Sequence, residues 1–93
     1  MQVLVLTVKL YAPWVQSLKE KRMVVKSLTA RMKNRFNASV READEQDTHK
    51  TAIIELAALC TGNAEADGLE EQMIGFIEQS TEAQVMEFMR EIR

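Results

Sequence analysis

The stretch QVLVLTVKLYA (residues 2–12) alternates between apolar and mixed positions, and this alternation decides the fold. Successive side chains of a strand point to opposite sides of the sheet, so one face of this segment would be fully apolar. That face carries Leu4, Leu6, Val8 and Leu10. The pattern predicts a strand with its apolar face on the core, ended by Pro13, which has no N–H for a ladder.

A helix is predicted to follow, beginning within SLKEKR (residues 17–22). Ser17 is a favoured N-cap residue and Glu20 lies three residues later, the spacing of a capping box. Asn37 is expected to close the helix in a left-handed conformation. The helix spans 18–36, and its apolar stripe consists of Leu18, Val25, Leu28, Met32 and Phe36.

The rest of the chain continues with three further segments of strand type and one of helix type. Residues 38–44 form a short, weakly patterned strand, and residues 51–61 form a strong one whose inward face is Ala52, Ile54, Leu56, Ala58 and Cys60. Asn63 is the expected N-cap of a helix over 64–79, with the stripe Ala66, Leu69, Met73, Phe76 and Ile77. Residues 83–92 alternate again, with Met86, Phe88 and Ile92 on one side.

The element order is therefore strand, helix, strand, strand, helix, strand. Two β-α-β crossovers joined by a hairpin predict an α+β, ferredoxin-like sandwich. Its four-stranded antiparallel sheet has the order 4-1-3-2, and both helices cover one face. The 93 residues are expected to form one such domain, over 1–93.

Composition narrows the class of protein. Apolar residues make up 46% of the chain and charged residues 28%, which is typical of a globular protein. The apolar run near the start, Val3 to Leu6, is far too short for a membrane span or a signal peptide. One cysteine, Cys60, cannot form an internal disulfide and agrees with a cytoplasmic location.

Charge is distributed unevenly, and the first helix is the strongest candidate for a binding surface. Residues 18–36 hold seven cations against one acid, whereas residues 37–93 hold four cations against thirteen acids. At 100° per residue, four of the cations gather in one stripe that could follow a phosphate backbone: Lys19, Arg22, Lys26 and Lys33. The alternative is an ordinary solvated helix whose field is partly neutralised by the acidic second helix beside it.

The uncovered face of the sheet is a second candidate surface. It is expected to present an apolar patch made of Val3, Val5, Ile53, Ala57, Leu59 and Val85. A patch on a face with no covering helix can form a homodimer or dock a protein partner. The alternative is a set of scattered apolar residues screened by Lys9, Glu55 and Glu87. Tyr11 is the one aromatic residue there, which disfavours base stacking of the RRM type.

Catalytic and metal chemistry find little support in the sequence. His49 lies in a polar loop, and Cys60 reads as a small core residue. The acids of the hairpin (Glu42, Asp44, Glu45 and Asp47) lack the spacing and turn glycine of a calcium loop. We therefore expect no enzyme, no metal site, no cofactor and no small-molecule ligand of recognisable type.

Several of these segments carry a resemblance to a known family. The opening VLVLTVKL, then SLKEKR, then KNRFNASVREADEQD, and the final strand ending REI resemble the YlxP-like family of small bacterial proteins. The resemblance runs over nearly the whole chain and implies a ferredoxin-like fold. The family's genes often lie among those for translation initiation and ribosome maturation, which implies a ribosome-related role.

Two hypotheses about function follow from these observations. The first is a non-enzymatic cytoplasmic binding module that contacts ribosomal RNA or ribosomal particles through the basic helix. The second is a homodimeric interaction module that uses the apolar sheet face and has no nucleic-acid role. Small-molecule sensing at a dimer interface is compatible with the fold but has no ligand motif behind it.

Overall fold

The computed structural model describes residues 1–43 and 50–93 as four strands and two helices. In chain order they are β1 (Gln2–Tyr11), α1 (Leu18–Arg35), β2 (Ser39–Ala43), β3 (Thr51–Cys60), α2 (Asn63–Ser80) and β4 (Gln84–Ile92). Each lies within one or two residues of its predicted bounds. The acids Asp44, Glu45 and Asp47 and the imidazole of His49 lie outside the described residues.

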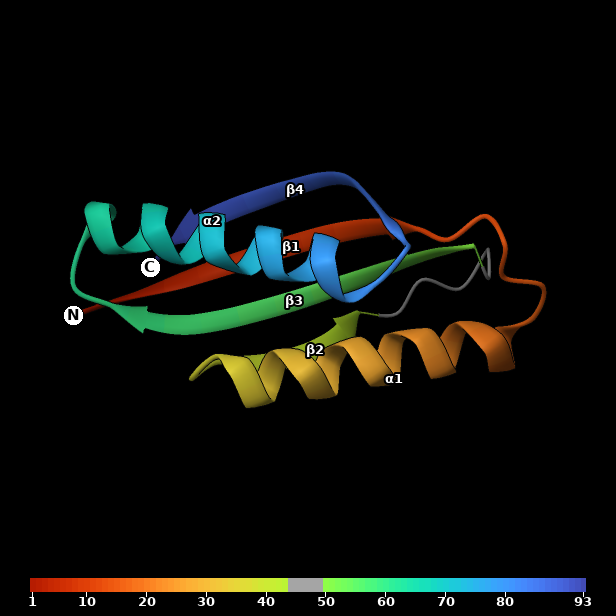
Figure 1. Ribbon diagram of the computed structural model, residues 1–93. Helices are drawn as coiled ribbons and strands as arrows, with labels where there is room; N and C mark the ends of the chain where they lie inside the picture. The colour runs from red at the N-terminus through yellow and green to blue at the C-terminus, as the bar shows by residue number, and fades with distance from the viewer. Residues whose placement is uncertain (44–49) are drawn as a thin grey trace.

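The sheet has the order β2-β3-β1-β4 with every neighbouring pair antiparallel, which confirms the ferredoxin-like prediction (Figure 1). β1 and β3 pair along their whole length, from Gln2 opposite Cys60 to Tyr11 opposite Thr51. β2 is half as long as these central strands, so it covers only part of the outer edge of β3.

Both helices cover the same face of the sheet, because both contribute to one core cluster with the inward residues of β1 and β3. Leu28 and Met32 of α1, and Met73 and Ile77 of α2, pack there. The alternating residues Leu6, Val8, Leu10, Ile54 and Leu56 supply the sheet side of the cluster. Burial along β1 alternates strictly, so a shift of one residue would expose this whole apolar set to water.

α1 begins as predicted and ends differently. The Ser17 hydroxyl accepts the backbone N–H of Glu20 at 3.1 Å, while the Glu20 carboxylate accepts the N–H of Gln16, one residue before the cap. The prediction that Asn37 closes the helix in a left-handed conformation is wrong. The C-cap is Phe36 in an extended conformation, with its N–H on the Met32 carbonyl, and no described non-glycine residue has positive φ.

One residue of the predicted α1 stripe also departs from expectation. Leu18 is 48% exposed, whereas Val25, Leu28, Met32 and Phe36 are buried. Leu18 is the first residue of α1. Lys21 is 5% exposed, and its Nζ lies 3.9 Å from a carboxylate oxygen of Glu42 in β2.

α2 begins one residue earlier than predicted. Asn63 is the first helical residue and not the N-cap, which is Gly62 without a side-chain cap bond. The first helical bond explains this, because the Ala66 N–H donates to the Gly62 carbonyl at 3.0 Å. The Thr61 hydroxyl donates to the Glu65 carboxylate at 2.8 Å, which holds the acid over the helix start, where the dipole favours an anion.

β4 contains a bulge that changes which face its residues occupy. The pairing with β1 shifts between Lys9 and Leu10: Lys9 lies opposite Glu87, but Leu10 lies opposite Val85. A bulge adds one residue on one strand and so reverses the alternation beyond it. Val85 consequently packs against the core, and its predicted place on the open sheet face is wrong. Phe88 and Ile92 share one side as predicted, since they lie opposite Val8 and Leu4, whereas Met86 is the extra residue of the bulge and has no partner in β1.

Candidate functional site

The four cations of the predicted nucleic-acid stripe lie along α1 and are all exposed. From Lys19 to Lys33 the helix advances about 21 Å at 1.5 Å per residue. At 100° per residue, Lys19, Arg22, Lys26 and Lys33 stay within an arc of about 60°. We call this set the cationic stripe. It is one straight, solvent-facing row of positive charge on the helix.

The stripe lies on the flank of α1 that faces away from α2. The cations on the other flank, roughly 150° around the helix by its 100° per residue, are Arg31 and Arg35. Arg31 donates from Nη1 to the Ser80 carbonyl at the end of α2, at 2.9 Å. Arg35 lies over the Phe36 ring at 4.9 Å and lines a groove together with Glu71 of α2. The flank of α1 that contacts α2 is therefore that of Arg31 and Arg35, and not that of the stripe.

No described acid pairs with a stripe cation. Within residues 1–43 and 50–93, none of the four nitrogens has a carboxylate oxygen within 4.0 Å. The ion pairs involve other cations, such as Arg90, which contacts Asp67 and, at 3.7 Å, Glu70. These contacts raise the pKa of Arg90, mainly through the hydrogen bond to Asp67. The positive charge of the stripe is thus not neutralised by a described carboxylate, as an anion-binding surface requires.

On the open sheet face, residues that are paired across neighbouring strands lie side by side in rows. Val3 lies opposite Leu59, and Val5 lies opposite Ala57 in the next row. These four residues form a continuous apolar block at one end of the face. The following row holds Arg41, Glu55, Thr7 and Met89, and the one after it Ala43, Ile53, Lys9 and Glu87.

The structure thus brings together part of the predicted sheet patch and separates the rest. Glu55, hydrogen-bonded to Arg41 at 2.9 Å, separates Ile53 from the apolar block, and Val85 is on the other face. Met89 belongs to the open face and is 70% exposed, against 61% for Leu59. The Arg41–Glu55 pair was not predicted. Its sequence signal is the alternation around Val40, which places Arg41 outward.

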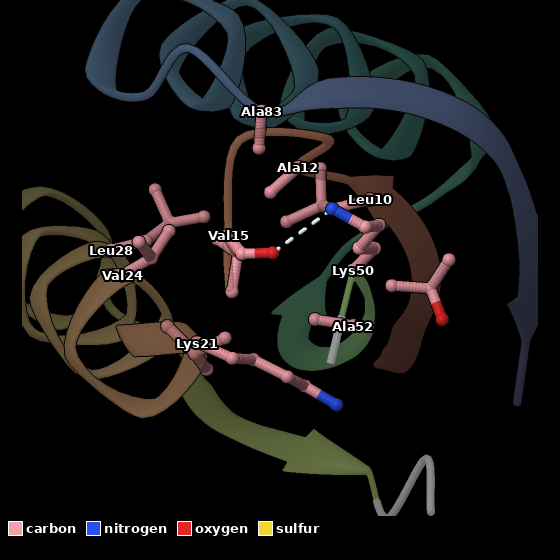
Figure 2. Close-up of a pocket in the computed structure, with 11 residues that line it drawn as sticks. Leu10, Ala12, Val15, Lys21, Val24, Leu28, Lys50, Ala52 and Ala83 are labelled. Atoms are coloured by element: carbon pink, nitrogen blue, oxygen red, sulfur yellow. Dashed lines mark hydrogen bonds between the residues drawn. The ribbon is translucent and has the colours of Figure 1, made fainter. Parts of the chain in front are cut away.

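Under the N-terminal half of α1, residues of α1, β1, β3 and the loop between β1 and α1 line a small cavity (Figure 2). It is lined mainly by apolar side chains and by the stems of Lys21 and Lys50. Lys50 Nζ donates to the carbonyls of Pro13 and Val15, at 2.6 and 3.1 Å, and so ties that loop to β3. The cavity volume of about 10 Å³ holds at most one water molecule. We therefore assign this site a structural role, which is to connect the loop to the sheet.

Metal-binding and thiol chemistry can be examined in the described part of the chain. There, no group of three or more His, Cys, Asp or Glu side chains is arranged to hold a metal ion. Cys60 is a free cysteine that is buried beside Leu4 and Ala66, as its predicted role in the core requires. Neither described helix has the length and apolar character needed to cross a membrane.

With the fold and these two surfaces described, comparison with known proteins identifies the family. A family model described as "Protein of unknown function (DUF503)" matches residues 3–90. The chain belongs to the DUF503 family. It is similar to the uncharacterised protein YlxP of Bacillus subtilis strain 168, with 33% identity over 66 residues that cover 71% of this chain and 72% of that protein. The YlxP-like resemblance is thereby confirmed.

Solved structures agree with the fold of this DUF503 protein. A structural-genomics structure of protein YJCS is similar with a TM-score of 0.60 and 14% identity, and covers 96% of both chains. A de novo designed protein with ferredoxin fold, LFR1 1, is similar with a TM-score of 0.61 and 16% identity, and the match covers 100% of this chain and 86% of the designed chain. At these identities the likeness establishes the fold alone.

Proposed function

We propose that this protein is a non-enzymatic, cytoplasmic binding module that contacts structured RNA through the cationic stripe of α1, with ribosomal RNA as the expected source. The observation that carries the proposal is the row of four exposed cations with no described acidic partner. Cations that neutralise phosphates release condensed counterions, and this release supplies most of the affinity of sequence-independent nucleic-acid binding.

The position of the stripe on α1 supports the proposal in two ways. Lys19 and Arg22 lie in the first turns of the helix, where free backbone N–H groups and the helix dipole also attract anions. The acidic helix α2 contacts the other flank of α1, and no described carboxylate lies within 4.0 Å of a stripe cation. A bound duplex would meet a straight row of charge of about 21 Å, given the rise of 1.5 Å per residue.

The kind of recognition expected is backbone contact without base reading. The stripe contains only lysine and arginine, and the open sheet face presents valine, alanine and leucine where an RRM presents stacking aromatics. Binding should therefore depend on RNA shape and charge more than on sequence. The ribosome-related role implied by the YlxP-like resemblance supports ribosomal RNA as the source.

The test is fluorescence anisotropy of a labelled, structured ribosomal RNA fragment titrated with the protein over a salt series. We expect an affinity that falls linearly on a log–log plot against salt concentration. A pull-down from lysate with and without ribonuclease is the cellular counterpart, and ribosomal particles should be recovered only without the nuclease. Absence of salt-dependent binding would reject the proposal and favour the alternative, a protein-interaction module with no nucleic-acid role.

A further inference from the structure

The open sheet face has a charge arrangement that distinguishes between two ways of stacking a second copy on it. A face-to-face dimer has a two-fold axis in the plane between the sheets, and where the strands of the two copies are aligned that axis lies either along the strands or across them. The cross-strand pairing fixes which residues meet in each case.

An axis across the strands, through the centre of the face, would oppose like charges. Each strand would then lie over the same strand of the second copy, with the row order reversed. Glu55 would meet Glu55, Arg41 would meet Arg41, and Glu87 would meet Glu91. Like charges brought together at an interface disfavour association, so electrostatics disfavour this arrangement.

An axis along the strands, between β1 and β3, has the opposite effect. β1 then lies over β3 of the second copy, and β2 lies over β4, with the rows in the same order. Leu59 meets Val3, and Val3 meets Leu59, so the apolar block of one copy covers that of the other. Arg41 comes between Glu87 and Glu91 of the second copy, since these acids flank Met89 in β4. No like charges are opposed.

The shape of the face fits this second arrangement. A groove of about 370 Å³ opens beside β2, lined on the open face by Val5, Ser39, Arg41, Glu55, Ala57 and Arg93. Met89 of the second copy lies opposite Arg41, one of the residues that line this groove, and at 70% it is the most exposed of the large apolar side chains in the strands. A methionine fills an irregular gap readily because its side chain is flexible and unbranched. By the two-fold symmetry, two methionines would fill two grooves.

We propose that the open sheet face is the interface of a two-fold symmetric homodimer, with the axis along the strands between β1 and β3. The occupant of the face is a second copy of this chain. Strand spacings of about 4.8 Å and rises of about 3.3 Å per residue give a projected face of roughly 500 Å² per copy, hence about 1,000 Å² per pair. That is near the lower limit for a specific interface, so we expect a weak dimer, with association measurable at micromolar concentration.

This inference does not depend on RNA binding, because the helices cover the opposite face of the sheet (Figure 1). Both cationic stripes would lie on the outside of the dimer.

The first experiment is sedimentation velocity over a concentration series with a matched pair of variants. Leu59→Lys places a charge in the apolar block, whereas Met23→Lys places one on the exposed side of α1; the two native side chains are 61% and 65% exposed. Leu59→Lys should weaken dimerisation at least roughly 100-fold, because symmetry places the substituted residue in the interface twice. Met23→Lys should leave it unchanged. A monomeric wild type at about 100 µM, or equal effects of the two variants, would overturn the proposal.

The second experiment identifies the axis. Stacked sheets lie about 10 Å apart, so opposed thiols are bridged with a short bismaleimide and not by a disulfide. In a Cys60→Ala background, an Arg41→Cys chain mixed with a Met89→Cys chain should give a mixed cross-linked dimer, while each alone gives little. Cross-linking of Arg41→Cys with itself would instead reveal the axis across the strands and refute the arrangement proposed here.

Discussion

Replacing the four stripe cations with glutamine is the most decisive perturbation of the proposed RNA surface. The substitutions Lys19→Gln, Arg22→Gln, Lys26→Gln and Lys33→Gln change the formal net charge from −2 to −6 and leave the apolar stripe and the Ser17 cap in place. None of the four cations has a described ion pair, so removing them breaks no ion pair among the described residues. The free energy of unfolding should change by less than about 1 kcal/mol, because exposed charges contribute little.

The expected effect on binding follows from counterion release. Each phosphate neutralised by a cation contributes about 0.9 to the slope of log affinity against log salt for a duplex, and about 0.7 for a single strand. Four lost contacts would flatten the slope by at most about 3.6, and allowing for a contact that is not made we expect about two to three. Affinity at low salt should fall steeply as well.

Two double variants on the same helix supply a matched control. Lys26→Gln with Lys33→Gln removes two charges from the stripe, and Arg31→Gln with Arg35→Gln removes two from the flank that meets α2. The two double variants have the same net charge, so an effect of net charge alone would change the salt dependence of RNA binding equally in both. The stripe pair should flatten the slope by up to about 1.8, and the other pair should leave it nearly unchanged.

The assay is the anisotropy titration at four or more salt concentrations, with circular dichroism to verify that each variant keeps its helical signal. The reasoning is refuted if the quadruple variant keeps the wild-type slope, or if the two double variants have the same slope. In either case the row of charge on α1 is ordinary solvated surface.

Three smaller predictions concern stability and ionisation. Gly68→Ala and Gly75→Ala should each raise the free energy of unfolding by about 0.5–1 kcal/mol, because an added Cβ meets no atom within 4 Å and neither glycine has positive φ. Chemical denaturation measures this change, and a loss of stability would show that α2 is packed more closely than described. Ser17→Ala should lower the melting temperature by removing a cap worth about 1 kcal/mol, while Ser17→Asp should restore it. The guanidinium of Arg93 holds the pKa of Glu91 below its ordinary value through a hydrogen bond of 2.9 Å and charge attraction. The pair therefore stabilises the fold at pH values above the ordinary pKa and loses this effect as the pH falls through the lowered pKa. NMR titration of Arg93→Gln should show a higher pKa for Glu91, and an unchanged pKa would contradict the assigned cause.

The architecture was predictable because its signals are local and periodic. The alternation in β1 and β3 and the helical spacing of apolar residues in α1 and α2 can each be recognised within a single segment of the chain. The order of the strands and helices then leaves few topologies that enclose one core. The exposure of Lys19, Arg22, Lys26 and Lys33 follows from the same helical spacing.

The helix ends were less predictable, because several residue types can occupy a cap with similar energies. Ser17 was placed correctly, since its hydroxyl and the acid three residues later form a specific pattern. Asn37 and Asn63 have the right chemistry for a cap, yet the backbone bonds to the Met32 and Gly62 carbonyls place the boundaries one residue earlier. The last helical bond of α1 and the first of α2 decided these ends, and side-chain preference did not.

Sequence by itself determined the order of the elements, the inward faces of the central strands and the row of positive charge along α1, because each depends on spacing within one segment. Only the tertiary structure decided which surfaces those elements share. The bulge opposite Lys9 and Leu10 moved Val85 to the core and left Met89 on the open face, and a change of alternation at one residue has no signature in composition. The rotation of α1 against α2 set Arg31 against the end of the acidic helix and the cationic stripe toward solvent, because contacts between segments far apart in the chain choose the direction of each side chain.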